Sequence, residues 1–241
     1  IIDKAQVDAV LCAASLREEI DAALGIVREG EVARGALYFN DASSETSLEA
    51  LAARHAGPFE AIDSAADDVC LISFTSGTTG IPKGTMHFHR DILAICDCFP
   101  RHVLKSQPGD VFIGTPPLAF TFGLGGLLLF PLRVGAAGVL LEKLTPETLL
   151  ACIEQYRATV CFTAPTFYRQ MAPLASKFDL SSLRQTVSAG EALPLPTRDA
   201  WKDATGLAMI DGIGATEILH IFISAAGDDI RPGATGKPVP G

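Results

Sequence analysis

The sequence predicts an α/β fold in which layers of mainly parallel sheet are flanked by helices. Three observations predict it. From Val69 onward, short apolar runs alternate with helix-like segments, which is typical of parallel strands covered on both faces. Thr145 followed by Pro146 marks a helix start, because Thr caps a helix and Pro suits its first turn. A Gly- and Thr-rich loop follows the first apolar run, and in such sheets ligands bind beyond the carboxyl ends of strands.

The expected elements follow one another along the chain. Residues 1–24 mix charged and apolar positions as an amphipathic helix does, and residues 1–66 as a whole predict helices near 16–24 and 46–55 and a strand at 36–40. Beyond a polar break at 65–68, the expected strands are 69–74, 85–89, 110–114, 136–142, 159–164, 183–190 and 207–214. The expected helices are 91–104, 123–132, 145–158, 166–175 and 196–205.

Composition and charge limit the classes of function. The 241 residues are 48% hydrophobic and 20% charged, so a sizeable core can be buried. The formal net charge of −9 argues against a general basic face and therefore against nucleic acid as a partner. Nucleotides remain compatible with this charge, because backbone N–H groups and one well-placed lysine bind phosphate regardless of net charge.

The cysteines and the apolar segments indicate in which cellular compartment the protein is expected. None of the six cysteines forms a CxxC pair or lies at zinc-ligand spacing from a histidine, which favours reduced, structural thiols in a cytoplasmic protein. Cys70 and Cys161 lie in apolar runs and are expected to be buried. The most apolar stretch, 123–141, is interrupted by Pro131 and Arg133, so it predicts a buried helix and strand and no association with a membrane.

The loop at 75–84, TSGTTGIPKG, carries the chemistry. It combines three glycines, four hydroxyl groups and one lysine with no carboxylate, which is what a triphosphate requires. It is not the P-loop of common NTPases, because that motif needs Ser or Thr directly after the lysine and then a helix. In this sequence Gly84 follows Lys83, and the next segment has the pattern of a strand.

Three motifs in order identify a family resemblance. TSGTTGIPKG at 75–84 resembles the phosphate loop of the adenylate-forming, AMP-binding superfamily, which includes acyl-CoA synthetases, adenylation domains of peptide synthetases and luciferases. SAGEAL at 188–193 and DGIGATE at 211–217 resemble the two motifs that follow it in that superfamily. With the segments 116–126 and 218–221, the sequence is most similar to benzoate- and 2-aminobenzoate-CoA ligases. The resemblance implies part of the large N-terminal domain of such an enzyme.

The resemblance implies a role for each matching residue. Ile213 stands where many relatives have a Tyr that stacks on adenine, so aromatic stacking would be lost there. Thr216 would bind the α-phosphate, and Glu217 would bind Mg²⁺, a hard cation that prefers oxygen ligands. The expected ATP-binding residues are Thr75, Ser76, Gly77, Thr78, Thr79, Gly80, Lys83, Ser188, Ala189, Gly190, Glu191, Asp211, Gly212 and Ile213. The expected catalytic residues are Thr216, Glu217 and His220. The expected acid pocket consists of Phe120, Thr121, Phe122, Gly214, His220 and Ile221.

The implied reaction is ATP-dependent activation of a benzoate-type acid to an acyl-adenylate, followed by transfer to CoA. Small-molecule acid, ATP, Mg²⁺ and CoA are the implied partners. Two alternatives stay open: an adenylation domain that loads a carrier protein, and an inactive nucleotide-binding relative. The intact Lys83, Thr216 and Glu217 argue against the inactive relative. The oligomeric state also stays open, a homodimer included.

The ends of the chain suggest a fragment. The chain starts at Ile1 without a Met, and its last residues, GKPVPG, form a turn-rich run that normally leads into another strand. We expect 1–65 to be part of a first subdomain and 66–241 to be the subdomain that binds ATP and the acid. Relatives carry a ribose-binding Asp and a mobile C-terminal domain with a catalytic Lys, neither of which is in this sequence. The chain alone is therefore expected to be inactive.

Overall fold

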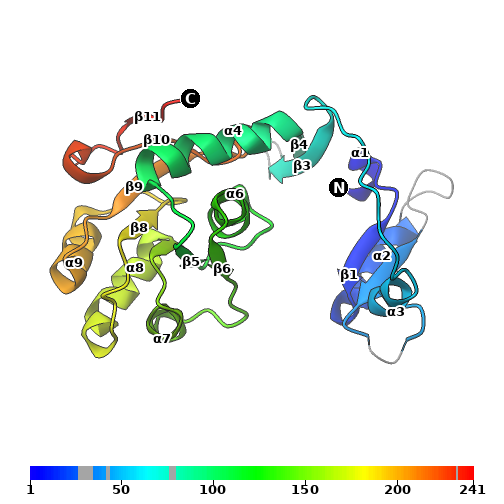
Figure 1. Cartoon of the computed structure of the whole chain (residues 1–241), viewed down its shortest axis with the longest axis horizontal. Coiled ribbons are helices and arrows are strands. Elements are labelled where there is room, and N and C mark those ends of the chain that lie inside the picture. The colour runs from blue at the N-terminus through cyan, green and yellow to red at the C-terminus, as the bar shows by residue number, and fades with distance from the viewer. Residues whose placement is uncertain (27–34, 42–43, 76–79, 232) are drawn as a thin grey trace. The chain divides into compact units, whose positions relative to one another are not determined.

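The computed structural model describes residues 1–26, 35–41, 44–75, 80–231 and 233–241. The chain divides into two compact units. The first unit combines Ile1–Ala65 with Phe74–Gly84, and the second combines Ala66–Ser73 with Thr85–Gly241. Figure 1 shows both units, with helices and strands labelled where there is room.

The first unit contains a short parallel pair of strands. Its elements are α1 (Ile2–Ala5), β1 (Val10–Ala13), η1 (Ala14–Leu16), α2 (Arg17–Ile26), β2 (Ala36–Phe39) and α3 (Leu48–Ala53). β1 pairs with β2, with Val10 opposite Ala36. The expectation of a helical pattern throughout 1–24 is therefore wrong at β1, because pairing with a strand about 25 positions later decides the conformation and local periodicity does not show it.

The second unit contains a seven-stranded sheet in the order β11-β10-β9-β8-β7-β5-β6. β6, β5, β7, β8 and β9 run parallel, and β10 and β11 join one edge antiparallel. A separate two-stranded sheet holds β3 and β4. The strand bounds are β3 (Val69–Thr75), β4 (Lys83–Phe88), β5 (Val111–Gly114), β6 (Ala137–Val139), β7 (Val160–Thr163), β8 (Gln185–Ser188), β9 (Ile210–Gly214), β10 (Ile221–Ser224) and β11 (Lys237–Pro238).

Helices cover both faces of this sheet, as expected. Successive strand residues point to opposite faces, so Phe112 packs with α4, η2, η3 and α6 whereas Ile113 packs with α7, α8 and α9. In Figure 1, α4 and α6 lie on one side of the sheet and α7, α8 and α9 on the other. The helical bounds are α4 (His89–Phe99), η2 (Pro100–Leu104), α5 (Thr121–Gly123), η3 (Leu124–Leu129), α6 (Phe130–Val134), α7 (Pro146–Tyr156), α8 (Pro165–Met171), η4 (Ala172–Lys177), α9 (Leu195–Thr205), η5 (Thr216–Ile218) and η6 (Gly227–Asp229).

The structure tests three local predictions: the start of α7 and the burial of Cys161 and Cys70. Thr145 caps α7 through a hydrogen bond from the Thr148 N–H, and Pro146 opens the helix, as predicted. Cys161 is buried, and burial raises the pKa of its thiol to about 12. Cys70 is exposed, so its expected burial is wrong; β3 lies outside the seven-stranded sheet and gains no cover from it.

The apolar stretch 123–141 forms a helical segment followed by a strand, as predicted, but the expected burial of that strand is wrong. Ala137 and Gly138 are exposed, because β6 is an edge strand of the seven-stranded sheet. η3 and α6 follow α5, and β6 then occupies only Ala137–Val139, which is shorter than the expected 136–142. Among the described residues, no helix combines the length and the apolar character that crossing a membrane requires.

Candidate active site

Two loops that carry predicted site residues lie at the same edge of the sheet. Ser188 ends β8, and Gly214 ends β9. These strands are parallel neighbours, with Ser188 opposite Asp211. Because carboxyl ends of parallel strands meet at one edge, the 189–191 turn and the 215–219 turn are brought together there. The family resemblance assigned residues of both motifs to ATP binding, and the structure brings the two motifs together.

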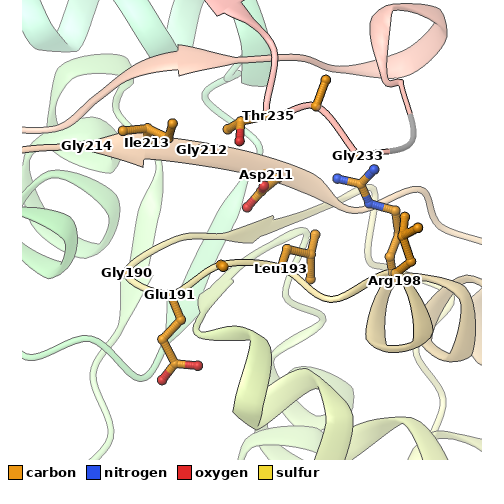
Figure 2. A pocket seen from close by; sticks show the side chains of 13 residues that line it. Gly190, Glu191, Leu193, Arg198, Asp211, Gly212, Ile213, Gly214, Gly233 and Thr235 are labelled. Carbon is orange, nitrogen blue, oxygen red and sulfur yellow. The ribbon is translucent and has the colours of Figure 1, made fainter.

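A pocket of about 490 Å³ lies between these strands, and we call it the β8–β9 pocket. Figure 2 shows Asp211, Gly212 and Ile213 along β9 on one side and Gly190 and Glu191 on the other, with Arg198 extending from α9. The lining residues are Gly190, Glu191, Ala192, Leu193, Leu195, Arg198, Asp211, Gly212, Ile213, Gly214, Gly233, Ala234 and Thr235.

The backbone of the 189–191 turn is open to this pocket. Gly190 has a φ of +87°, a left-handed conformation that favours glycine, and no atom lies within 4 Å of the place where a Cβ would stand. Glu191 is held away from Asp211 and Arg198, because the Thr166 hydroxyl donates to its Oε2 at 2.7 Å. The turn therefore offers backbone and open space to a flat ligand, and it does not place the Glu191 carboxylate in the middle of the pocket.

Asp211 is the half-buried acid of the β8–β9 pocket. Burial raises the pKa of its carboxyl, and the Arg198 charge opposes this rise. The Asp211 carbonyl accepts a hydrogen bond from the Ser224 hydroxyl at 2.7 Å, which ties β9 to β10. Ile213 is 47% exposed and gives the same pocket an apolar wall.

A second pocket, of about 710 Å³, adjoins the first and shares Gly190, Glu191 and Gly214 with it. We call it the Phe120 pocket. It brings together every residue predicted for the acid pocket. Its lining residues are Thr115, Pro116, Pro117, Phe120, Thr121, Phe122, Ala164, Ala189, Gly190, Glu191, Gly214, Ala215, Thr216, His220 and Ile221.

The two phenylalanines of this pocket differ in packing. Phe120 is 66% exposed and is not part of the core. Phe122 is partly buried and packs edge-on against Phe162 at a centroid distance of 5.6 Å. Phe120 therefore stands at the open side of the pocket, and Phe122 forms its fixed wall.

His220 lies at the bottom of the Phe120 pocket and is 2% exposed. Burial lowers the pKa of the imidazole to about 3, so the ring is neutral at physiological pH. Nε2–H donates to the Phe122 carbonyl at 3.4 Å, and Nδ1 is buried without a partner among the described residues. Four phenylalanine rings surround the imidazole at centroid distances of 4.5 to 6.1 Å: Phe99, Phe122, Phe130 and Phe162. His220 contributes a neutral aromatic surface, and its predicted catalytic role stays a prediction.

Glycines set the closeness of these aromatic walls. A Cβ on Gly125 would collide with His220 Cδ2, and a Cβ on Gly126 would lie 2.8 Å from the Phe162 ring. Contacts this short are essentially absent between real side chains, so both positions need glycine for the rings to pack as they do. The GLGG sequence at 123–126 thus shapes the back of the pocket.

Thr216 and Glu217 occupy the turn η5 beyond β9. Thr216 lines the Phe120 pocket, and Glu217 is exposed, with no hydrogen bond or ion pair to any described residue. Mg²⁺ in nucleotide sites uses one or two protein carboxylates and completes its shell with phosphates and water, so one unpaired carboxylate fits such an ion. No cluster of three or more potential metal ligands occurs within the described part of the chain.

The 75–84 loop, predicted to bind phosphate, is described only at its two ends. Ser76, Gly77, Thr78 and Thr79 lie outside the described residues. Thr75 ends β3, Gly80 has a φ of +78°, and Lys83 begins β4 with an exposed side chain. The Pro82 carbonyl next to Lys83 accepts a hydrogen bond from Lys4 Nζ at 2.6 Å, within the first unit.

Sequence reasoning missed several pocket residues. Arg198 and Thr235 line the β8–β9 pocket, and Thr115 lines the Phe120 pocket. Arg198 had a usable signal, because it lies in the helix that directly follows the 188–193 motif. Thr235 had none, since it comes close only through the antiparallel return of β10 and β11.

Comparisons with known proteins agree with these motifs. The profile of the AMP-binding enzyme family matches residues 1–241. A benzoate–CoA ligase of Thauera aromatica is 40% identical over 202 residues, which are 83% of this chain and 38% of that protein. An anthranilate–CoA ligase of Pseudomonas aeruginosa is 39% identical over 173 residues, which are 71% of this chain and 33% of that protein.

A solved structure extends the similarity to the fold. The crystal structure of an anthranilate CoA ligase in complex with anthranoyl-AMP superposes with a TM-score of 0.84 at 38% identity. The superposition covers 97% of this chain and 45% of that one. The chain thus spans less than half the length of these relatives.

Proposed function

Because the chain belongs to the AMP-binding enzyme family, we propose that the protein carrying it activates a benzoate-type aryl acid with ATP and transfers the acyl group to CoA. The observation that carries this proposal is the junction of the two pockets. The β8–β9 pocket and the Phe120 pocket share Gly190, Glu191 and Gly214. A nucleotide in the first pocket and an aryl acid in the second would meet at that junction, where a carboxylate can reach the α-phosphate.

We assign adenine to the β8–β9 pocket. Its walls suit a flat ring, with the open backbone at Gly190 on one side and the apolar Ile213 on the other. Ser188 ends β8 and Ala189 follows it, Gly212 lies within β9, and Asp211 offers an oxygen acceptor in the lining of the pocket. The Arg198 charge lowers the pKa of the Asp211 carboxyl and so favours its charged form, against the effect of burial.

Within the second unit we assign the α-phosphate to Thr216. By family resemblance, the 75–84 loop with Lys83 is the phosphate loop. In the reaction, the acid's carboxylate oxygen attacks the α-phosphorus of ATP and pyrophosphate leaves. The sulfur of CoA then attacks the acyl carbon and AMP leaves. A carboxylate and a phosphate, both anions, must approach each other in the first step. The protein must therefore supply positive charge that reduces their repulsion, and Lys83 is the residue that would supply it. Mg²⁺, when bound, would neutralise phosphate charge, and Glu217 is the residue that would hold it.

We assign the acid to the Phe120 pocket, where Phe122 and the neutral His220 provide aromatic walls and Gly214 adds no side chain to the lining. Thr121 contributes a hydroxyl to that lining for a polar ring substituent. Relatives named for benzoate, anthranilate and hydroxybenzoates support an aryl acid as substrate.

An acid panel tests this assignment. We expect the full-length protein to convert benzoate or 2-aminobenzoate to CoA thioesters with a kcat/KM at least about 100-fold above that for palmitate, because a long alkyl chain cannot use the flat aromatic walls and must displace packed rings. Thioester formation is measured by chromatography at matched acid concentrations. A preference for palmitate would contradict the aryl-acid proposal. Parallel reactions with CoA omitted, in which only acyl-adenylate accumulates, identify CoA as the acceptor.

A further inference from the structure

A buried histidine outside both pockets contacts the turn that carries Thr216 and Glu217. His87 lies on β4, directly after the phosphate loop, and is 3% exposed. Its Nε2 lies 2.8 Å from the carbonyl oxygen of Thr216, 129 positions along the chain. A carbonyl can only accept, so Nε2 carries the hydrogen and His87 donates. Both residues belong to the second unit.

The turn has little local support of its own. The residue before it, Ala215, provides no side-chain cap, and the turn ends at Leu219 with a φ of 64°, a conformation that L-residues rarely adopt. Such backbone persists when surrounding contacts determine it. The burial of Leu219, at 1% exposed, is one such contact. The His87 hydrogen bond is another, and it acts on the carbonyl that also accepts from the Leu219 N–H at 3.2 Å.

His87 is itself held in place. Its own carbonyl lies 3.5 Å from the thiol of Cys70, which is the donor, and the two residues lie on the paired strands β4 and β3. The next residue, Phe88, donates its N–H to the Asp91 carboxylate at 2.9 Å at the start of α4. The imidazole therefore extends from a fixed backbone, which is what a positioning contact requires.

We propose that His87 is a positioning residue that holds the Thr216 backbone, so that the Thr216 hydroxyl and the Glu217 carboxylate stay placed for the α-phosphate and its metal ion. This inference rests on the proposed function. The hydrogen bond uses the backbone carbonyl alone, so both side chains of the turn stay available to ligands. His87 thereby links the strand that follows the phosphate loop to the turn that follows β9.

Three substitutions separate positioning from simple core packing. His87→Leu removes the donor, His87→Gln keeps an N–H donor near the place of Nε2, and His87→Asn moves the donor nearer the backbone. In the full-length protein we expect His87→Leu and His87→Asn to lower kcat for acid-dependent thioester formation by roughly 10- to 100-fold, since small misplacements of reacting groups have effects of this size. We expect His87→Gln to stay within about threefold of wild type, and the KM for CoA to change little in all three.

Controls and alternative outcomes are distinguishable. His102→Leu removes an exposed histidine on η2 and should leave kcat unchanged. Equal losses in His87→Gln, His87→Asn and His87→Leu that follow their melting temperatures would overturn positioning, and so would unchanged kcat in His87→Leu. If the wild type shows no acid-dependent activity, the proposed function fails first. Calorimetric Mg·ATP affinity then decides this inference: it stands if only His87→Gln binds like wild type, and it fails if His87→Leu does too.

Discussion

Replacement of Glu217 by Gln is expected to lower acid-dependent ATP–pyrophosphate exchange by about 10²- to 10³-fold, the usual size of a lost preorganised electrostatic contact. The change keeps the shape of the side chain and removes only its charge. Glu217 is exposed and forms no ion pair with the described residues, so nothing in the fold is expected to depend on that charge. The loss should therefore appear in the reaction and leave the melting temperature nearly unchanged.

A matched control strengthens the Glu217 experiment. Glu142→Gln makes the same chemical change at an exposed position beyond β6 that lines neither pocket. We expect its exchange rate to equal that of wild type. If Glu217 holds the metal ion, raising the Mg²⁺ concentration should recover part of the Glu217→Gln activity. Equal exchange rates for the two variants would remove Glu217 from the metal site.

Replacement of Arg184 by Leu is expected to have the largest effect on stability, about 3–5 kcal/mol, because it leaves a buried carboxylate without its cation. Asp110 precedes β5, its side chain is 5% exposed, and Arg184 Nε donates to it at 2.8 Å. The Thr159 hydroxyl and the Gln107 N–H also donate to Asp110, each at 2.8 Å. This network joins the amino ends of β5, β7 and β8, the edge opposite the pockets.

Amide hydrogen exchange in β5, β7 and β8 of the full-length protein measures this effect. Arg133→Leu is the matched control, since Arg133 pairs with Asp97 in an ion pair whose side chains are 45% and 46% exposed. Exposed pairs contribute little to stability, so exchange should change far less in this control. Similar exchange in the two variants would show that the Asp110 network does not support the sheet.

The pH dependence of the same experiment follows from Asp110. Burial raises the pKa of its carboxyl, but the hydrogen bonds from Arg184, Gln107 and Thr159 outweigh this, so the pKa is lowered. A lowered folded-state pKa stabilises the fold above the unfolded value of about 3.9 and loses that contribution as pH falls below it. The loss of stability that Arg184→Leu causes relative to wild type should therefore have its full size near pH 6 and become smaller below about pH 4.

Much of the second unit could be predicted because the alternation of apolar runs and helix-like segments in its sequence matches its parallel sheet and covering helices. Ser188 and Asp211 end up side by side because two apolar runs become parallel neighbours, which the alternation of strands and helices indicates. The pocket residues at 120–122 and 220–221 came from resemblance to relatives, and the structure brings them together in one lining.

What could not be predicted depends on partners distant in the sequence. β1 forms only because β2 lies beside it, and Cys70 is exposed because β3 pairs outside the main sheet. Thr235 lines the β8–β9 pocket because β10 and β11 pair in an antiparallel arrangement, which the local sequence pattern does not indicate. The contact of His87 with Thr216 joins residues 129 positions apart, and the sequence offered only a histidine on a strand.

Acid-dependent exchange of labelled pyrophosphate into ATP, measured on the full-length protein without CoA, tests aryl-acid activation most directly. The exchange requires reversible formation of the acyl-adenylate and no later step. With benzoate or 2-aminobenzoate, we predict exchange far above the rate without acid, and with palmitate a rate near that background. Exchange that is absent with every aryl acid, or that is supported by palmitate and not by benzoates, would contradict aryl-acid activation at the junction of the two pockets.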